Sequence, residues 1–253
     1  MYSASTSSLV NAEERDAKVL GVDSNPLDTI QTITWDRNET TRFIAGGWDG
    51  ILRIYTIQFN PLGINQADAY YLEDPILGSA MDCNNYIAFT GHTDGHIKMI
   101  SLQARQTAIL GKLPAPVKDL YWCYEINSLI AVTIDCHLTF WQTSNIGAPV
   151  FSVQLPHKTV VSAFDYPYLL LGSSDEKMCI LRVDQPNAMN VNTYIDSPLG
   201  QFCKLMSADV SASSKGWLVC SMDGRGNYGN FRDLPAGVDC RDTVVCFKAQ
   251  KRE

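Results

Sequence analysis

One stretch decides the fold: an apolar run, Phe43-Ile44-Ala45, then the turn Trp48-Asp49-Gly50, then Ile51-Leu52-Arg53-Ile54-Tyr55. Asp-Gly accommodates the positive φ angles of a tight hairpin turn. The flanking runs are short and rich in β-branched and aromatic residues, which is typical of strands. The stretch therefore predicts two antiparallel strands joined by a turn.

The same unit recurs along the chain, with the turn aspartates 45, 41, 40 and 48 positions apart and an apolar run before each turn. The turns are Trp48-Asp49-Gly50, Thr93-Asp94-Gly95, Ile134-Asp135-Cys136, Ser174-Asp175-Glu176 and Met222-Asp223-Gly224. A period of about 43 residues with three or four strands is typical of a WD40-like β-propeller, whose blades are small stacked sheets. An all-β sandwich with accidental Asp turns is the alternative, and the even spacing disfavours it.

Chain length limits the number of blades. A blade takes about 40–45 residues, so 253 residues cannot hold a complete seven-bladed ring. We expect an all-β, WD40-like β-propeller with five recognisable blades, either closed or an incomplete seven-bladed ring. A polar N-terminal tail, 1–26, precedes a propeller domain, 27–253, with repeats at about 28–58, 67–103, 115–143, 158–185 and 199–233.

Composition excludes several classes of protein. Apolar residues make up 45% of the chain and charged residues 19%, which is typical of a globular protein. No apolar run approaches the ~20 residues that span a bilayer, and Met1 to Asn11 lacks the apolar core of a secretory signal. We therefore expect an intracellular protein, whose eight cysteines are small buried hydrophobic residues.

Several segments, in the same order and spacing, resemble WD40 mRNA export factors of the Rae/Gle type. The resemblance is carried in the third blade by Ala115-Pro116-Val117-Lys118-Asp119-Leu120-Tyr121-Trp122 and Leu138-Thr139-Phe140-Trp141-Gln142-Thr143. It continues in the fourth blade with Val153-Gln154-Leu155-Pro156 and Phe164-Asp165-Tyr166-Pro167. It extends from about Asp28 to Lys248, and the last two blades of that family have no counterpart in it.

The resemblance implies a non-catalytic adaptor in nuclear mRNA export, without a cofactor. Such proteins dock on a GLEBS motif of an FG nucleoporin at the nuclear pore, shuttle to the cytoplasm, and in some cases bind single-stranded RNA weakly. The related Bub-type propellers hold GLEBS motifs of checkpoint kinases on the same face, so a mitotic spindle-checkpoint scaffold is the alternative. A propeller-fold enzyme is a remote alternative, because no convergent catalytic residues are recognisable.

The resemblance also indicates a partner-binding site. In that family a Trp commonly precedes the Asp of the blade turns on the peptide-binding face. Trp48 keeps this position, and Thr93 and Ile134 stand at it in the second and third repeats. We expect these residues to contact a partner peptide, because exposed aromatic side chains often anchor such partners. The alternative for Trp48 is an indole packed over its own turn.

The turn aspartates are interpreted as structural, because each belongs to a different blade and supports its own turn. They are Asp49, Asp94, Asp135, Asp175 and Asp223. A general acid–base pair would need carboxylates that converge on one cleft. The histidines lack the spacing of metal ligands, so we expect no metal site.

Three basic residues near the C-terminal end, Lys204, Arg225 and Lys248, are candidates for RNA contact. The net charge of −7 and the scattered basic residues favour an ordinary solvated surface as the alternative. The run Gly224–Gly229 fits G-x-G-x-x-G, but no helical pattern follows it. We therefore interpret it as a hairpin turn with a glycine-rich strand.

Overall fold

The computed structural model describes residues 28–175, 177–184, 195–196, 205–211, 216–221, 226–230 and 245–247. Over these residues the chain forms twenty β-strands, arranged as five four-stranded antiparallel sheets in which the strands follow one another in chain order. This confirms the predicted all-β propeller with five blades. Nothing in this part of the chain forms a helix that could cross a membrane.

Each sheet is a meander of four consecutive strands. The first contains β1 (Ile30–Trp35), β2 (Arg42–Gly47), β3 (Ile51–Phe59) and β4 (Leu62–Tyr71). The second contains β5 (Ile76–Asp82), β6 (Ile87–His92), β7 (His96–Ser101) and β8 (Gln106–Lys112). The third contains β9 (Val117–Cys123), β10 (Ser128–Thr133), β11 (His137–Trp141) and β12 (Phe151–Gln154).

The remaining two sheets follow the same order. The fourth contains β13 (Thr159–Asp165), β14 (Tyr168–Ser173), β15 (Lys177–Arg182) and β16 (Ile195–Asp196). The fifth contains β17 (Leu205–Ser211), β18 (Gly216–Ser221), β19 (Gly226–Asn230) and β20 (Val245–Phe247). Gly226 and Gly229 both lie in β19, so the glycine-rich run ends in a strand.

The position of a strand in its sheet explains its composition. All six residues of β10 are buried, because it is a central strand and the second and fourth sheets cover the two faces of its sheet. In β12, at the outer edge of the same sheet, half-buried and exposed residues alternate. The central strands are therefore continuous apolar runs, whereas the outer strands are polar and harder to recognise.

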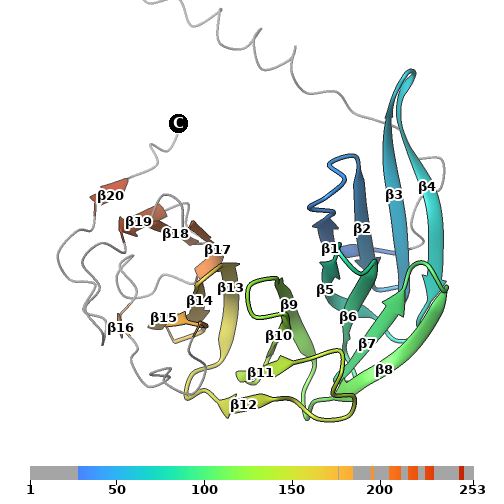
Figure 1. Cartoon of the computed structure of the whole chain (residues 1–253). Helices are drawn as coiled ribbons and strands as arrows, with labels where there is room; N and C mark the ends of the chain where they lie inside the picture. The colour runs from blue at the N-terminus through green and yellow to red at the C-terminus, as the bar shows by residue number, and fades with distance from the viewer. Residues whose placement is uncertain are drawn as a thin grey trace, which may run out of the picture.

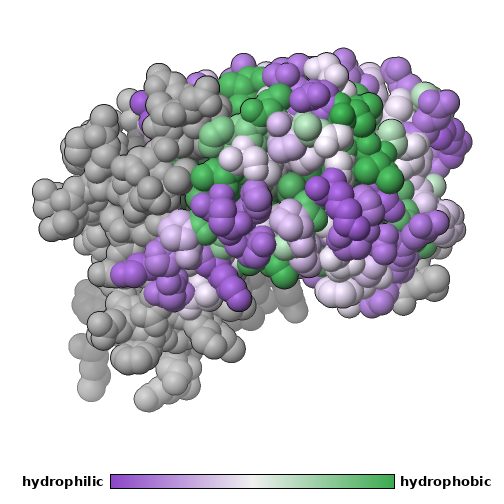
Figure 2. All heavy atoms as spheres, turned by 90° about the horizontal axis from the view of Figure 1, so that it is seen from below, coloured by the Kyte–Doolittle hydropathy of each residue, from purple (hydrophilic) through white to green (hydrophobic). Residues whose placement is uncertain are grey.

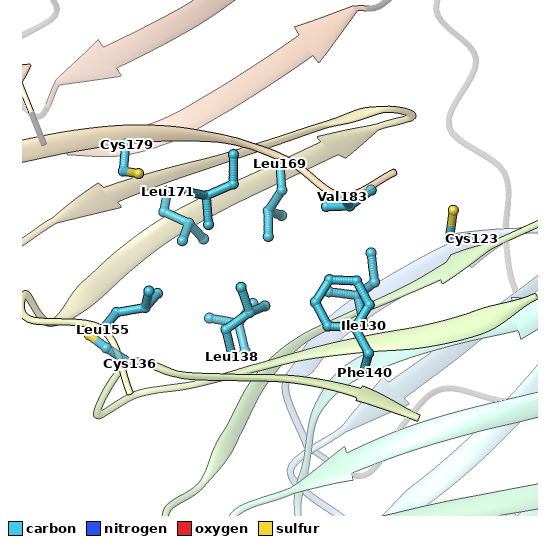
Figure 3. Close-up of a cluster of buried hydrophobic side chains, with 12 residues drawn as sticks. Cys123, Ile130, Cys136, Leu138, Phe140, Leu155, Leu169, Leu171, Cys179 and Val183 are labelled. Carbon is cyan, nitrogen blue, oxygen red and sulfur yellow. The ribbon is translucent and has the colours of Figure 1, made fainter. Parts of the chain in front are cut away.

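The sheets follow one another around an arc (Figure 1), with first strands such as β5 and β9 on the inner side and fourth strands such as β8 and β12 outside. A separate apolar cluster joins each sheet to the next. Figure 3 shows the cluster between the third and fourth sheets, where Ile130, Leu138 and Phe140 face Leu169 and Leu171. The core is thus a series of interfaces between sheets.

Close packing fixes the sheets against their neighbours. The indole of Trp141, in the third sheet, lies over Gly111 of the second, where an added Cβ would come within 2.2 Å of it. In the same interface the rings of Phe89 and Trp122 stack with centroids 5.2 Å apart. The side of the molecule in Figure 2 carries hydrophilic side chains with smaller hydrophobic areas between them.

The arc has two ends. Figure 1 shows the first sheet and the fifth sheet on opposite sides of an opening. In the described part of the chain, the first sheet packs by one face against the second, and the fifth packs by one face against the fourth. Each end of the arc therefore presents a second sheet face that no other described sheet covers.

Candidate functional site

Four hairpin turns form one edge of the arc, which we call the turn face: β2–β3, β6–β7, β10–β11 and β14–β15. The first residue of each turn donates its backbone N–H to the carbonyl that precedes the first strand of its sheet. The pairs are Trp48 to Thr29 at 3.0 Å, Thr93 to Pro75 at 3.2 Å, Ile134 to Pro116 at 3.1 Å, and Ser174 to Lys158 at 3.0 Å. The structure therefore places these four residues at equivalent positions.

The side chains at these positions differ in exposure. Trp48 is 46% exposed and Ile134 is 45% exposed, whereas Thr93 between them is half-buried. The Trp48 indole Nε1 donates to Gln31 Oε1 at 3.3 Å, which orients the ring while leaving much of it accessible. The turn face thus presents two apolar side chains on rigid turns. Ser174, which is exposed, has the same offset from its Asp and belongs to this set, although it is not among the partner-binding residues expected from the sequence.

The aspartates of the first two turns accept hydrogen bonds from the strand that follows. Asp49 Oδ1 accepts from the Ile51 amide at 3.1 Å, and Asp94 Oδ1 accepts from the His96 amide at 3.0 Å. Asp49 also pairs with the Arg53 guanidinium at 2.7 Å, with both side chains buried. Burial opposes ionisation of Asp94, but hydrogen bonds from His96 hold the pKa of its carboxyl below the ordinary value.

The third and fourth turns use a hydroxyl as an intermediary. The His137 amide donates to Thr133 Oγ1 at 2.8 Å, and this hydroxyl donates to Asp135. In the fourth turn the Lys177 amide donates to Ser173 Oγ at 3.0 Å, and Ser173 donates to Asp175. Each carboxylate thus supports its own turn, and Asp175 in addition pairs with His157 Nδ1 at 2.5 Å, in the loop before the fourth sheet.

Cys136 occupies the position that glycine has in the first two turns. Its φ is 74°, beside 69° for Gly50 and 89° for Gly95. Its thiol is fully buried, accepts the Thr159 N–H at 2.7 Å and donates to the His157 carbonyl. Burial raises the pKa of this thiol, so it stays neutral and anchors the turn to the loop before the fourth sheet.

The residues that directly follow β4, β8 and β12 bond to the first three turns. The carbonyls of Gly50, Gly95 and Cys136 accept backbone N–H groups from Leu72, Leu113 and Leu155 at 2.8, 2.8 and 2.9 Å. The loops that leave the outer strands are thereby fixed to the turns, and the first three turns share this backbone hydrogen bond. A rigid scaffold of this kind can hold exposed side chains at fixed spacings.

A second concavity lies on the inner side of the arc. This central cavity has a volume of about 410 Å³ and is lined by β1, β5 and β9 with Phe164 of β13. Its hydroxyl groups bond across sheets: Thr34 to Ser79 at 2.8 Å, and Ser162 to Asp119 at 2.6 Å. These bonds join neighbouring sheets, which is a structural role. In the ranges that the structure describes, no three His, Cys, Asp or Glu side chains group as metal ligands.

Four of the residues singled out in the sequence lie outside the described residues. They are the turn residue Asp223 and the three candidates for RNA contact, Lys204, Arg225 and Lys248. The candidate site therefore consists of the turn face over the first four sheets, with Trp48 and Ile134 as its exposed apolar side chains.

Comparison with solved structures identifies the class of fold. The chain is similar to the WD40 β-propeller domain of Doa1, with a TM-score of 0.64 and 13% identity over 83% of this chain and 68% of that one. It is also similar to a chain of the Mitotic Checkpoint Complex, with a TM-score of 0.69 and 12% identity over 89% of this chain and 69% of that one. The chain has the WD40 β-propeller fold.

The sequence points to a particular relative. Over 131 residues it is 24% identical to the mitotic checkpoint protein BUB3.3 of Arabidopsis thaliana, a match that spans 51% of this chain and 39% of that protein. No family model matches the sequence. The name of this relative is that of a mitotic checkpoint protein, the class that stands above as the alternative to an mRNA export factor.

Proposed function

We propose that this chain is a non-catalytic adaptor of the spindle checkpoint, which captures a GLEBS-type peptide of a checkpoint kinase on its turn face. The observation that carries the proposal is the placement of Trp48 and Ile134, both exposed, at equivalent positions on rigid turns. The similarity to BUB3.3 and to a chain of the Mitotic Checkpoint Complex supports this choice of partner. Residence in the nucleus is part of the proposal.

The physical basis is the burial of apolar surface against a preorganised scaffold. Turns fixed at both ends lose little conformational entropy when a peptide binds. Truncation of an aromatic anchor typically weakens binding by about 2 kcal/mol, which is about thirtyfold in Kd. We therefore expect a loss of this size for Trp48→Ala and a smaller loss for Ile134→Ala, because Ile buries less area.

The test is a calorimetric titration of a kinase GLEBS peptide into the wild-type chain and its variants. Phe59→Ala is the control for Trp48→Ala, because Phe59 is 66% exposed at the far end of the first sheet. Ile146→Ala, in the loop after β11, is the control for Ile134→Ala. Equal affinity of Trp48→Ala and the wild type, with both folded, would refute the role of this residue.

The second candidate function is adaptor in nuclear mRNA export, docked on a GLEBS motif of an FG nucleoporin. The segments Val153-Gln154-Leu155-Pro156 and Phe164-Asp165-Tyr166-Pro167 favour it through their resemblance to export factors. Affinity purification from nuclear extract separates the two candidates, because checkpoint kinases are expected in one case and FG nucleoporins in the other. RNA contact by Lys204, Arg225 and Lys248 stays a prediction, and such binding would weaken as salt rises.

A further inference from the structure

Three residues from three consecutive sheets meet at the end of the central cavity that is opposite the turn face. The first strands β1, β5 and β9 begin at the turn face and stand side by side along the inner side of the arc (Figure 1). Arg37 follows the end of β1 by two residues, Cys83 directly follows β5, and Tyr124 directly follows β9. Arg37 and Tyr124 both line the cavity.

Direct contacts hold these three residues together. The Arg37 amide donates to Cys83 Sγ at 3.2 Å. The Tyr124 hydroxyl donates to the Met81 carbonyl at 3.2 Å and accepts the Cys83 N–H at 3.1 Å. Arg37 Cζ lies over the Tyr124 ring, 4.8 Å from its centroid, which is a cation–π distance. Two hydrogen bonds thus fix the ring, and the guanidinium rests on its face.

The charge of Arg37 has no carboxylate partner in the described part of the chain. The acidic side chains next to it in the sequence, Asp36 and Glu39, both pair with Arg42 instead. Burial raises the pKa of Tyr124, so its phenol stays neutral and does not balance the arginine. A guanidinium that rests on a ring keeps its N–H groups available at its edge, where they can bind an oxyanion with two parallel hydrogen bonds.

A buried hydrogen-bond donor belongs to the same end of the cavity. Trp122 lines the cavity and is 8% exposed, and its indole Nε1–H has no hydrogen-bond partner among the described residues. Tyr124 meets this indole edge to face, with ring centroids 6.4 Å apart. Buried polar groups are nearly always hydrogen-bonded, so an unpaired donor in a cavity wall points to an acceptor that binds there.

The cavity has the size and the walls of a small-molecule site. Its volume of about 410 Å³ lies within the ordinary range of such sites, about 300–1,000 Å³. Tyr121 and Phe164 add two more aromatic side chains to its walls. Of the described residues that line it, Arg37 and Asp119 are charged, and Asp119 pairs with Lys118 at 2.6 Å. The charge that is left without a partner is therefore positive.

We propose that this end of the central cavity binds a small aromatic oxyanion, with its carboxylate or phosphate on Arg37 and its ring among the aromatic walls. The fixed guanidinium supplies charge-assisted hydrogen bonds, and Trp122 Nε1 supplies a second, neutral donor. Arg37, Cys83 and Tyr124 touch one another across the first three sheets. The site therefore uses the sides on which these sheets meet, and it is separate from the turn face.

The test is a titration of phenyl phosphate and of phenylacetate into the full chain, followed by the indole N–H signals in nuclear magnetic resonance. The range extends to about 10 mM, because a Kd of about 1 mM is expected for ligands of this size. The signal of Trp122 should move and saturate, while that of Trp48 on the turn face stays in place. A response to one of the two probes supports the proposal and tells phosphate from carboxylate. Benzyl alcohol, which has the ring without the charge, should bind about tenfold more weakly.

Arg37→Gln removes the charge and should weaken the binding of the responding probe about tenfold or more. An unchanged circular dichroism spectrum is expected, because Arg37 is exposed. Arg105→Gln is the matched control: it changes the net charge equally, and Arg105 is exposed in the β7–β8 turn, where it pairs with Asp68. This variant should bind the probe like the wild type.

A Trp122 signal that neither probe moves would overturn the proposal. Equal affinity of Arg37→Gln and the wild type, an equal loss in Arg105→Gln, or equal binding of benzyl alcohol would also overturn it. Titrations with a kinase peptide report on Trp48 at the opposite edge, so the two proposals fail independently.

Discussion

Replacing Cys136 separates two effects that the structure places on one residue. Its φ of 74° lies in the left-handed region, which costs a side-chain-bearing residue about 1–2 kcal/mol relative to glycine. Its thiol satisfies the Thr159 amide and the His157 carbonyl, and leaving such buried groups unpaired costs about 1–3 kcal/mol. The volume lost with the sulfur adds about 1 kcal/mol.

The glycine variant of Cys136 should therefore be more stable than the alanine variant. Cys136→Ala loses the thiol and keeps the strained backbone, so the free energy of unfolding should fall by about 2–4 kcal/mol. Cys136→Gly also loses the thiol but relieves the backbone, and should be about 1 kcal/mol more stable than Cys136→Ala. Within strands the alanine variant is usually the more stable one, because glycine generally destabilises a strand relative to alanine.

The assay is urea unfolding of the full chain followed by far-UV circular dichroism, with the m-values of the variants compared. Equal m-values indicate that the free energies refer to the same transition. A Cys136→Ala variant as stable as Cys136→Gly, or more stable, would refute the inference that this residue takes the place of a turn glycine.

Two further predictions concern the interfaces and the turns. Gly111→Ala should lower the free energy of unfolding by about 2–3 kcal/mol, because its Cβ would meet the Trp141 indole. Gly63→Ala is the control: its Cβ would meet open space, so the free energy of unfolding should change by less than about 0.5 kcal/mol. Equal effects of the two substitutions in urea unfolding would contradict the packing of Trp141 over Gly111. The pKa of Asp94 is lowered in the folded state, so its contribution to stability is present above about pH 4 and is lost as the pH falls through the folded-state pKa. The free energy of unfolding should therefore fall less steeply with acidification in Asp94→Asn than in the wild type. The range to measure is about pH 2 to 5, which brackets the ordinary carboxyl pKa of about 4, and identical profiles of the two proteins would contradict this expectation.

The repeat of turns and apolar runs predicted the sheets, because central strands must be apolar on both faces. The fourth strands were not located: β8 and β12 lie at the outer edge, where Gln106 and Ser152 face solvent and the apolar pattern is weak. The long extension of the β3–β4 hairpin was not located either, although Ile57, Phe59, Leu62 and Ile64 alternate with polar residues around a two-residue turn.

The candidate site could be predicted only in part. The offset from the turn Asp places Trp48, Thr93 and Ile134 at one edge of the fold, and the same offset would have added Ser174. Sequence could not show that Cys136 adopts a glycine conformation, because the contacts that hold it come from a loop more than twenty residues away. The lower exposure of Thr93 depends likewise on tertiary packing.

The most direct test of the proposed function follows the indole N–H signals of the five tryptophans by nuclear magnetic resonance during peptide titration. The signals are assigned by single Trp→Phe variants. Binding of a kinase GLEBS peptide to the turn face should shift the signal of Trp48, which is half exposed, and leave that of the buried Trp141 in place. A saturating peptide that leaves the Trp48 signal unmoved would contradict the proposed site.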